Sequence, residues 1–172
     1  DTDLEGLGPL AGDLRIVRGT EFWELGLYEE ARVEFENLRE FVSASPENSF
    51  RLANYLLDLG LYRPAIFASR QILTLAGLDE QAASLRAPPY FNHVRYGTYY
   101  ADLTVTNAEA HGLHPLLLFS VVRQESLFEG FVRSNAGARG LMQIIPSTGA
   151  SIAKSIGWPV AFDPEDLYRP YV

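Results

Sequence analysis

A seven-residue sequence occurs twice in the first half of the chain, at a spacing of 34 residues. Leu25-Gly-Leu-Tyr-Glu-Glu-Ala31 recurs as Leu59-Gly-Leu-Tyr-Arg-Pro-Ala65. In each copy the glycine is suited to end one helix and turn the chain, and the alanine permits close packing of the next helix. The recurrence therefore predicts two helix pairs of similar construction. The side chains expected to bury their faces are Phe35, Leu38 and Phe41 in the first copy and Phe67, Ile72 and Leu73 in the second.

The period resembles that of tetratricopeptide helix pairs. Two copies are too few for a free-standing solenoid, because neighbouring repeats must cover each other's apolar faces. Pro46 also comes later than the repeat pattern would place it. We therefore expect this array either to extend upstream or to dock onto the second half of the chain.

Helical patterns continue along the rest of the chain and no segment indicates a strand, so the predicted fold class is all-α. The expected helices cover about Leu10 to Leu25, Tyr28 to Ser43, Pro46 to Gly60, Arg63 to Ala76, Asp79 to Leu85, Tyr99 to His111, a helix from Pro115, and Ser147 to Ile156. Arg86-Ala-Pro-Pro-Tyr90 breaks the pattern, and an aromatic-rich loop is expected after it. This break predicts a boundary between domains at 1–86 and 87–172.

A carboxyl group lies on an apolar helical stripe in the second half. At helical spacing one face is shared by Leu117, Leu118, Val121, Val122 and Glu125. A carboxylate on a buried stripe is costly unless it is paired or protonated, and a protonated carboxyl group can serve as a general acid. The alternative is that Glu125 lies at the helix end and is simply solvated.

The segment after this helix indicates a tight loop followed by a buried turn. Ser134-Asn-Ala-Gly-Ala-Arg-Gly140 is made of small residues and leaves its backbone free to approach a ligand. Leu141-Met-Gln-Ile-Ile145 is apolar except for Gln143. A buried amide needs hydrogen-bond partners, which for Gln143 would be either substrate in a cleft or the backbone of the loop.

These motifs together resemble the catalytic domain of the soluble lytic transglycosylases, lysozyme-like enzymes of the bacterial envelope. The resemblance rests on Gln124-Glu125-Ser126, Ser134 and Gly137-Ala-Arg-Gly140-Leu-Met-Gln143 with Pro146, and covers roughly residues 90–160. Several of these enzymes carry a helical superhelix ahead of the catalytic domain. The resemblance thus implies a tetratricopeptide-like superhelix in 1–86 and a lysozyme-like α-helical catalytic domain in 87–172.

The same resemblance implies a reaction and a set of residues. The β-1,4 bond between N-acetylmuramic acid and N-acetylglucosamine in peptidoglycan would be cleaved with formation of a 1,6-anhydromuramyl end, Glu125 acting first as acid and then as base. The residues implied for substrate binding are Ser134, Met142 and Gln143, and those of the structural motif are Ser126, Gly137 and Gly140. A hydrolytic muramidase, or a non-catalytic module that binds a glycan or a partner protein, remains the alternative.

The other carboxylates near this segment have simpler interpretations. Most glycosidases use two carboxylates, but Glu129, one helical turn after Glu125, is interpreted as a solvated surface residue. The cluster Asp163, Glu165 and Asp166 is expected to cap a helix at Leu167. Relatives continue with further helices and a tyrosine near the acid, so we expect a catalytic domain truncated at its C-terminus, which would be inactive if that missing wall is required.

Charge and composition narrow the partners. The net charge of −8 argues against nucleic acid, whose phosphates require a basic surface. The three histidines lack the spacing of a zinc site, no Asp-rich calcium loop is present, and neither metal nor cofactor is predicted. The sequence contains no cysteine, and neither a signal peptide nor a membrane-spanning run is predicted from it. Peptidoglycan glycan strands are the expected partner, with an envelope protein as a possible second partner of the helical repeats.

Overall fold

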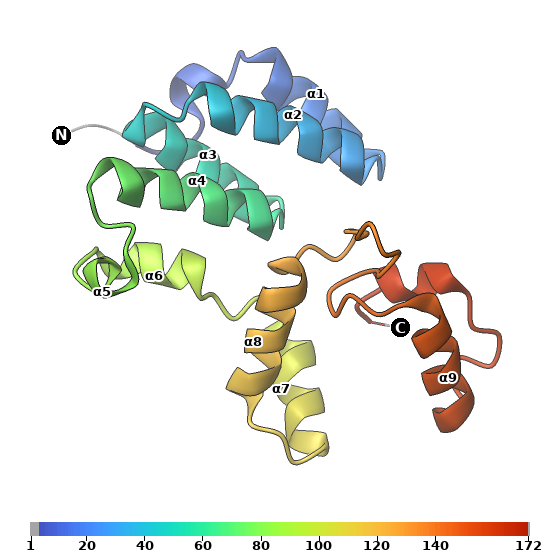
Figure 1. The fold of residues 1–172 in the computed structure, drawn as a ribbon. Coiled ribbons are helices and arrows are strands. Elements are labelled where there is room, and N and C mark those ends of the chain that lie inside the picture. The colour runs from blue at the N-terminus through green and yellow to red at the C-terminus, as the bar shows by residue number, and fades with distance from the viewer. Residues whose placement is uncertain (1–3, 172) are drawn as a thin grey trace. The chain divides into compact units, whose positions relative to one another are not determined.

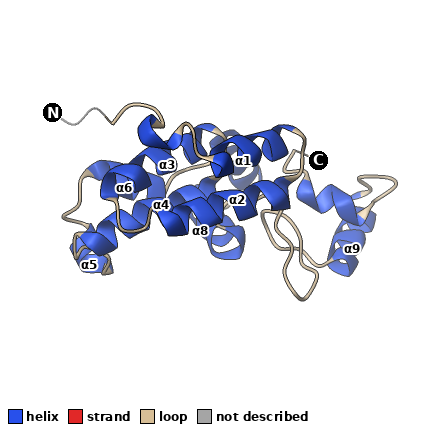
Figure 2. Ribbon diagram, turned by 90° about the horizontal axis from the view of Figure 1, so that it is seen from above, coloured by secondary structure: helices blue, strands red, loops and turns tan. Residues whose placement is uncertain are grey.

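The computed structural model describes residues 4–171, with only the backbone described at Gln81, and it is helical (Figures 1 and 2). Its described part contains no strand, only isolated bridges from Arg133 to Arg139 and from Arg139 to Ile144. The all-α prediction is confirmed. Two compact units are formed, the first ending at Gly97 and the second beginning at Thr98.

The first unit contains a short 3-10 helix and six α-helices in its described residues. These are η1 (Gly8–Leu10), α1 (Leu14–Glu24), α2 (Tyr28–Phe41), α3 (Pro46–Asp58), α4 (Tyr62–Leu75), α5 (Gln81–Ser84) and α6 (Pro89–Arg95). Helices α1 and α2 pack as one pair and α3 and α4 as another. The two predicted helix pairs are therefore present.

The recurring sequence forms the same helix end in both pairs. The N–H of Leu27 donates to Phe22 O at 2.8 Å, and the N–H of Leu61 donates to Leu56 O at 2.8 Å. Each bond spans six residues and closes the helix through a glycine of positive φ, as in a Schellman motif. The alanine that ends each copy is fully buried. The repeat in the sequence is thus a repeat of one capping structure.

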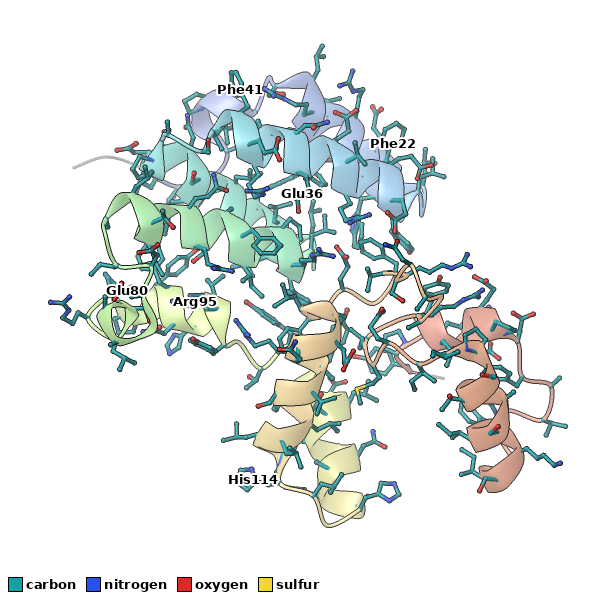
Figure 3. The ribbon with its side chains drawn as sticks, in the orientation of Figure 1. Phe22, Glu36, Phe41, Glu80, Arg95 and His114 are labelled. Atoms are coloured by element: carbon teal, nitrogen blue, oxygen red, sulfur yellow. The ribbon has the colours of Figure 1, made fainter. Side chains whose placement is uncertain are left out.

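One predicted core residue of the first pair is not buried. Phe41 is 71% exposed (Figure 3), with the guanidinium of Arg15 4.3 Å from its ring centre. The buried face of α2 continues from Phe35 and Leu38 to Val42 instead. At 100° per residue Val42 returns to the direction of Phe35, whereas Phe41 points well away from it.

The first unit extends beyond the predicted boundary because α6 packs against α4. The expected aromatic loop after residue 88 begins as a helix, with Pro89 in its first turn. Tyr90 on this helix donates to Asn54 Oδ1 at 2.7 Å, and its ring centre lies 4.9 Å from that of Phe50. These contacts with α3 explain why the division between units falls after Gly97.

The second unit contains α7 (Ala101–Ala110), α8 (Pro115–Ser126), α9 (Pro146–Ile156) and the 3-10 helix η2 (Pro164–Tyr168). Helix α8 begins with Pro115 after His114, whose Nδ1 accepts from the N–H of Leu116 at 3.2 Å (Figure 3). His114 is therefore an N-cap. None of the helices described in residues 4–171 combines the length and the hydrophobicity needed to cross a membrane.

Two predictions about helix ends in the second unit have different outcomes. Asp163 caps η2 as expected, since its Oδ1 accepts from the N–H of Glu165 at 2.8 Å. Ser147, where α9 was expected to begin, is instead the second residue of the helix, and Ile145 occupies the N-cap without a side-chain bond. Pro146 starts this helix because its missing N–H needs no partner in the first turn.

Candidate functional site

Glu125 lies in the last turn of α8, and it is exposed. The predicted burial of its stripe is wrong for Leu117, which is 56% exposed, and right for Val122. The buried face of α8 is instead formed by Phe119, Val122 and Ser126, about a third of a turn away. The alternative interpretation of a solvated carboxylate at the helix end matches the structure. Ser126, the next residue, is buried and donates its hydroxyl to Val122 O at 3.1 Å.

Glu129 has the opposite environment to the one predicted, because it is only 3% exposed. After Ser126 the chain turns through two successive left-handed residues, Leu127 (φ 52°) and Phe128 (φ 65°). This turn directs Phe128 inward, where its ring packs edge-on against Tyr99 at 5.2 Å. Glu129 follows it inside. The prediction assumed that helical periodicity continued past Ser126, and no glycine or asparagine marks where it stops.

The loop that follows is tight, as predicted, and its tip is closed by Ser134. The N–H of Ser134 donates to Ala138 O at 2.9 Å, and Ser134 Oγ accepts from the N–H of Ala138 at 3.0 Å. Gly137 stands between them with a φ of 82°. In the structure Ser134 thus holds the backbone of the loop.

Gln143 also bonds to the loop. Its Nε2 donates to Val132 O at 3.2 Å and to Gly140 O at 2.9 Å, while its own backbone has a φ of 48°. Of the two partners considered for this amide, the loop backbone is the one that the structure contains. These bonds close the turn at residues 140–143.

Gly140 is required by its surroundings. A Cβ atom built on it would lie 1.8 Å from Leu167 O, and its φ is 73°. The backbone of η2 therefore packs directly on the turn. Residue 140 has a backbone conformation that residues other than glycine rarely adopt.

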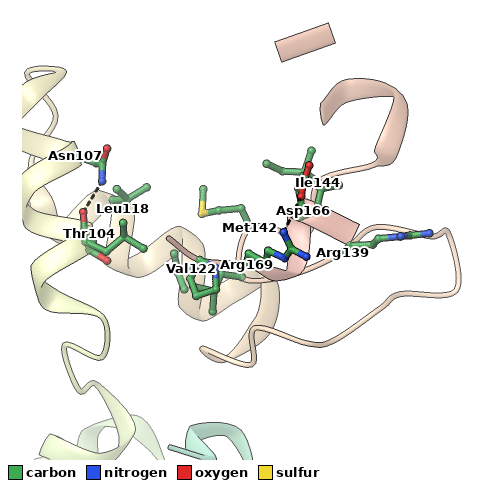
Figure 4. Close-up of a pocket in the computed structure, with 13 residues that line it drawn as sticks. Thr104, Asn107, Leu118, Val122, Arg139, Met142, Ile144, Asp166 and Arg169 are labelled. Atoms are coloured by element: carbon green, nitrogen blue, oxygen red, sulfur yellow. Dashed lines mark hydrogen bonds and ion pairs between the residues drawn. The ribbon is translucent and has the colours of Figure 1, made fainter. Parts of the chain in front are cut away.

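Beside this turn lies a pocket of about 330 Å³ (Figure 4), largely apolar, between α7, α8, the loop and η2. Its lining residues are Leu103, Thr104, Asn107, Leu118, Val122, Arg139, Leu141, Met142, Ile144, Asp166, Leu167, Arg169 and Pro170. Met142 is the predicted substrate-binding residue in this lining. Glu125, Ser134 and Gln143 are not part of it, so the structure does not gather the predicted site residues around one pocket.

No group of three or more His, Cys, Asp or Glu side chains in the described residues is arranged to hold a metal ion. The acidic side chains of Asp163, Glu165 and Asp166 form hydrogen bonds within η2 and an ion pair with a neighbouring arginine. Asp166 accepts from the N–H of Asp163 at 2.9 Å, and Glu165 pairs with Arg139.

Residues 102–171 match the Transglycosylase SLT domain family. The matched residues include α8 with Glu125 and the whole loop to Gln143. The resemblance stated for these motifs is confirmed.

The similarity of this chain to known proteins extends beyond the residues that match the SLT domain. The soluble lytic murein transglycosylase of Salmonella typhimurium (strain LT2) is 28% identical over 156 residues, which are 90% of this chain and 21% of that protein. An inactive mutant of the lytic transglycosylase Slt from Pseudomonas aeruginosa, with one glutamate replaced by glutamine, aligns with 99% of this chain at a TM-score of 0.73 and 25% identity.

The 70 kDa soluble lytic transglycosylase Slt70 from Escherichia coli shares the fold, with a TM-score of 0.74 and 24% identity. The alignments to the two solved structures include the helices before the SLT domain, because each covers 99% of this chain. The chain spans about a quarter of the length of each. The tetratricopeptide-like character of the first unit stays a prediction.

Proposed function

We propose that this protein is a lytic transglycosylase that acts on peptidoglycan in the bacterial envelope. The observation that carries the proposal is the SLT domain over residues 102–171, which encloses both the Glu125-Ser126 pair and the Gly140–Gln143 turn. The similarity to proteins that carry the name lytic transglycosylase over 90% or more of this chain supports it.

In the proposed reaction Glu125 serves as acid and then as base. Its protonated carboxyl group gives a proton to the glycosidic oxygen between N-acetylmuramic acid and N-acetylglucosamine, and the bond from C1 of the muramyl residue to that oxygen breaks. The carboxylate then takes the proton of the muramyl 6-hydroxyl, whose oxygen bonds to C1 of the same ring. Water is neither added nor released, and Glu125 regains its proton. The attack is intramolecular, so it benefits from proximity. In well-oriented cases proximity can lower the activation barrier by about 7 kcal/mol or more.

One feature of the structure and one property of a relative support a single carboxylate. Residues 115–145 contain two acidic side chains, Glu125 and Glu129, and the second is buried whereas the first is open to a glycan. The relative from Pseudomonas aeruginosa is inactive with one glutamate changed to glutamine. Since a glycosidase of the common type needs two carboxylates at the scissile bond, this arrangement favours the transglycosylase over the hydrolase.

Ser134, Met142 and Gln143 are proposed to contact the sugar, and Met142 lines the pocket beside the turn. Ser134 and Gln143 already bond to the loop backbone. Substitution of either would therefore act on the shape of the loop as well as on substrate. The glycan strand is the proposed partner of the SLT domain, and an envelope protein is the proposed partner of the helix pairs.

The test is to incubate this chain with purified peptidoglycan and to identify the released muropeptides by mass spectrometry. Anhydromuramyl products are expected, and Glu125→Gln should abolish them. Glu109→Gln is a matched control, because Glu109 is also exposed and is also the penultimate residue of its helix, α7. Reducing ends that contain oxygen from labelled water would favour a muramidase instead, and saturable glycan binding without products would favour a binding module.

A further inference from the structure

The turn at residues 140–143 has an additional attachment, made by the residue at its base. The N–H of Arg139 donates to Ile144 O at 3.1 Å, and the N–H of Ile144 donates back to Arg139 O at 3.2 Å. From this backbone pair the side chain of Arg139 extends to η2. There its Nη1 donates to Glu165 Oε1, and its guanidinium carbon lies 5.5 Å from the ring centre of Tyr168. The Arg139 side chain is only 14% exposed.

Gly140 permits the turn to approach η2 but makes no hydrogen bond to it. Its N–H donates to Val132 O at 3.0 Å, and its carbonyl accepts from Gln143, so both polar groups are used inside the loop. For the residues that the structure describes, the bond from Arg139 to Glu165 is the one hydrogen bond between the turn and η2. The hydrogen bonding between the two segments therefore depends on Arg139.

The helix that Arg139 contacts, η2, is itself held in place by other interactions. The side chains of Asp163 and Asp166 close a capping box across the first turn of η2. Phe162 and Leu167 pack on α9 at Gly149, where a Cβ atom would lie 2.8 Å from the Phe162 ring and 3.2 Å from Leu167. A contact with η2 thus fixes the turn relative to α9.

We propose that Arg139 is a positioning residue for the reaction, acting through Glu165 and Tyr168 on the turn that carries Met142 and Gln143. The inference rests on the proposed transglycosylase function. Arg139 is suited to this task because a planar guanidinium donates to a carboxylate and stacks on an aromatic ring at once, whereas a lysine ammonium does not stack in this way.

Four variants of the full chain and one control variant test the proposal by kinetics on soluble glycan strands. Arg139→Gln is expected to lower kcat/KM about tenfold, mainly through kcat, because a small displacement of groups beside the reacting sugar costs rate. Glu165→Gln should have a smaller effect since the stacking on Tyr168 remains, and the double variant should be no slower than Arg139→Gln alone. The kcat/KM of Arg139→Lys should lie between those of the unmodified chain and Arg139→Gln, because lysine keeps the ion pair and loses the stacking. Arg133→Gln is the matched control, an exposed arginine in the same loop, and should leave kcat/KM and the melting temperature unchanged.

Amide hydrogen exchange gives a readout that needs no activity. Arg139→Gln should speed exchange at the Ile144 amide, which is bonded to residue 139, and leave the amides of α8 unchanged. Exchange and kcat/KM equal to those of Arg133→Gln would overturn the proposal. A fall in kcat/KM without faster exchange would also overturn it, because Arg139 would then act on substrate directly. If the unmodified chain cleaves nothing, the proposed function fails, while the exchange measurement still decides whether Arg139 holds the turn.

Discussion

Replacing Gly140 with alanine is expected to destabilise the second unit by about 3 kcal/mol. A left-handed backbone costs a residue with a Cβ atom roughly 1–2 kcal/mol. The new methyl group would also lie 1.8 Å from Leu167 O, which must retreat to at least 3.0 Å. Forcing an extra carbon into a packed site of this kind costs about 1–3 kcal/mol more. The backbone of η2 must move to relieve the contact.

Gly137 provides the control for this calculation. It lies in the same loop with a φ of 82°, but a Cβ atom built there meets nothing within 4 Å. Gly137→Ala should therefore cost only the backbone strain, about 1 kcal/mol. The difference between the two variants isolates the contact with Leu167.

Urea unfolding monitored by tryptophan fluorescence measures both variants. The chain has two tryptophans, Trp23 in the first unit and Trp158 in the second, so a Trp23→Phe background reports on the second unit. The free energies of unfolding are compared between variants for which this free energy depends equally steeply on urea concentration. If Gly140→Ala costs no more than Gly137→Ala, the close packing of η2 on the turn plays no part in stability and the reasoning is refuted.

Three further predictions follow from burial and charge. Glu125→Gln should lower the rate of muropeptide release by about 10²-fold or more, as expected for a general acid, with an unchanged circular dichroism spectrum because the side chain is exposed; a rate near that of the unmodified protein would contradict the proposed role. Phe35→Ala should cost about 3–5 kcal/mol in thermal or urea unfolding, against about 0.5 kcal/mol for Phe41→Ala, and equal costs would contradict the observed burial. Burial, with a smaller contribution from the negative charge of Asp58, raises the pKa of Tyr90 to about 12. The stability due to its neutral form is therefore complete below pH 10 and is lost as the pH rises from about 10 towards 12; a Tyr90→Phe variant with the same loss over this range would contradict the assignment.

Much of the fold could be predicted because helix ends have local signals. Prolines start α3, α8 and α9 in their first turns, and the repeated Leu-Gly-Leu ends α1 and α3 with the same hydrogen bond. These signals depend on the backbone of a few neighbouring residues, so the sequence contains them directly.

The environment of the candidate site was predicted less well, because it depends on which face of a helix is covered. Leu117 and Val122 are both apolar and both fall within the predicted stripe, yet only Val122 is buried. Which of two overlapping apolar stripes packs inward is decided by the neighbouring segments. The left-handed turn at Leu127 and Phe128 had no signal either, since leucine and phenylalanine rarely adopt that conformation.

That turn also separates two negative charges. On a continuous helix Glu125 and Glu129 would be neighbours at i and i+4, where like charges repel by about 0.2–0.5 kcal/mol. By ending α8 between them, the turn leaves Glu125 in water and takes Glu129 into the interior. The two side chains therefore lie in different surroundings. Glu125 is open to solvent, while Glu129 is out of reach of it.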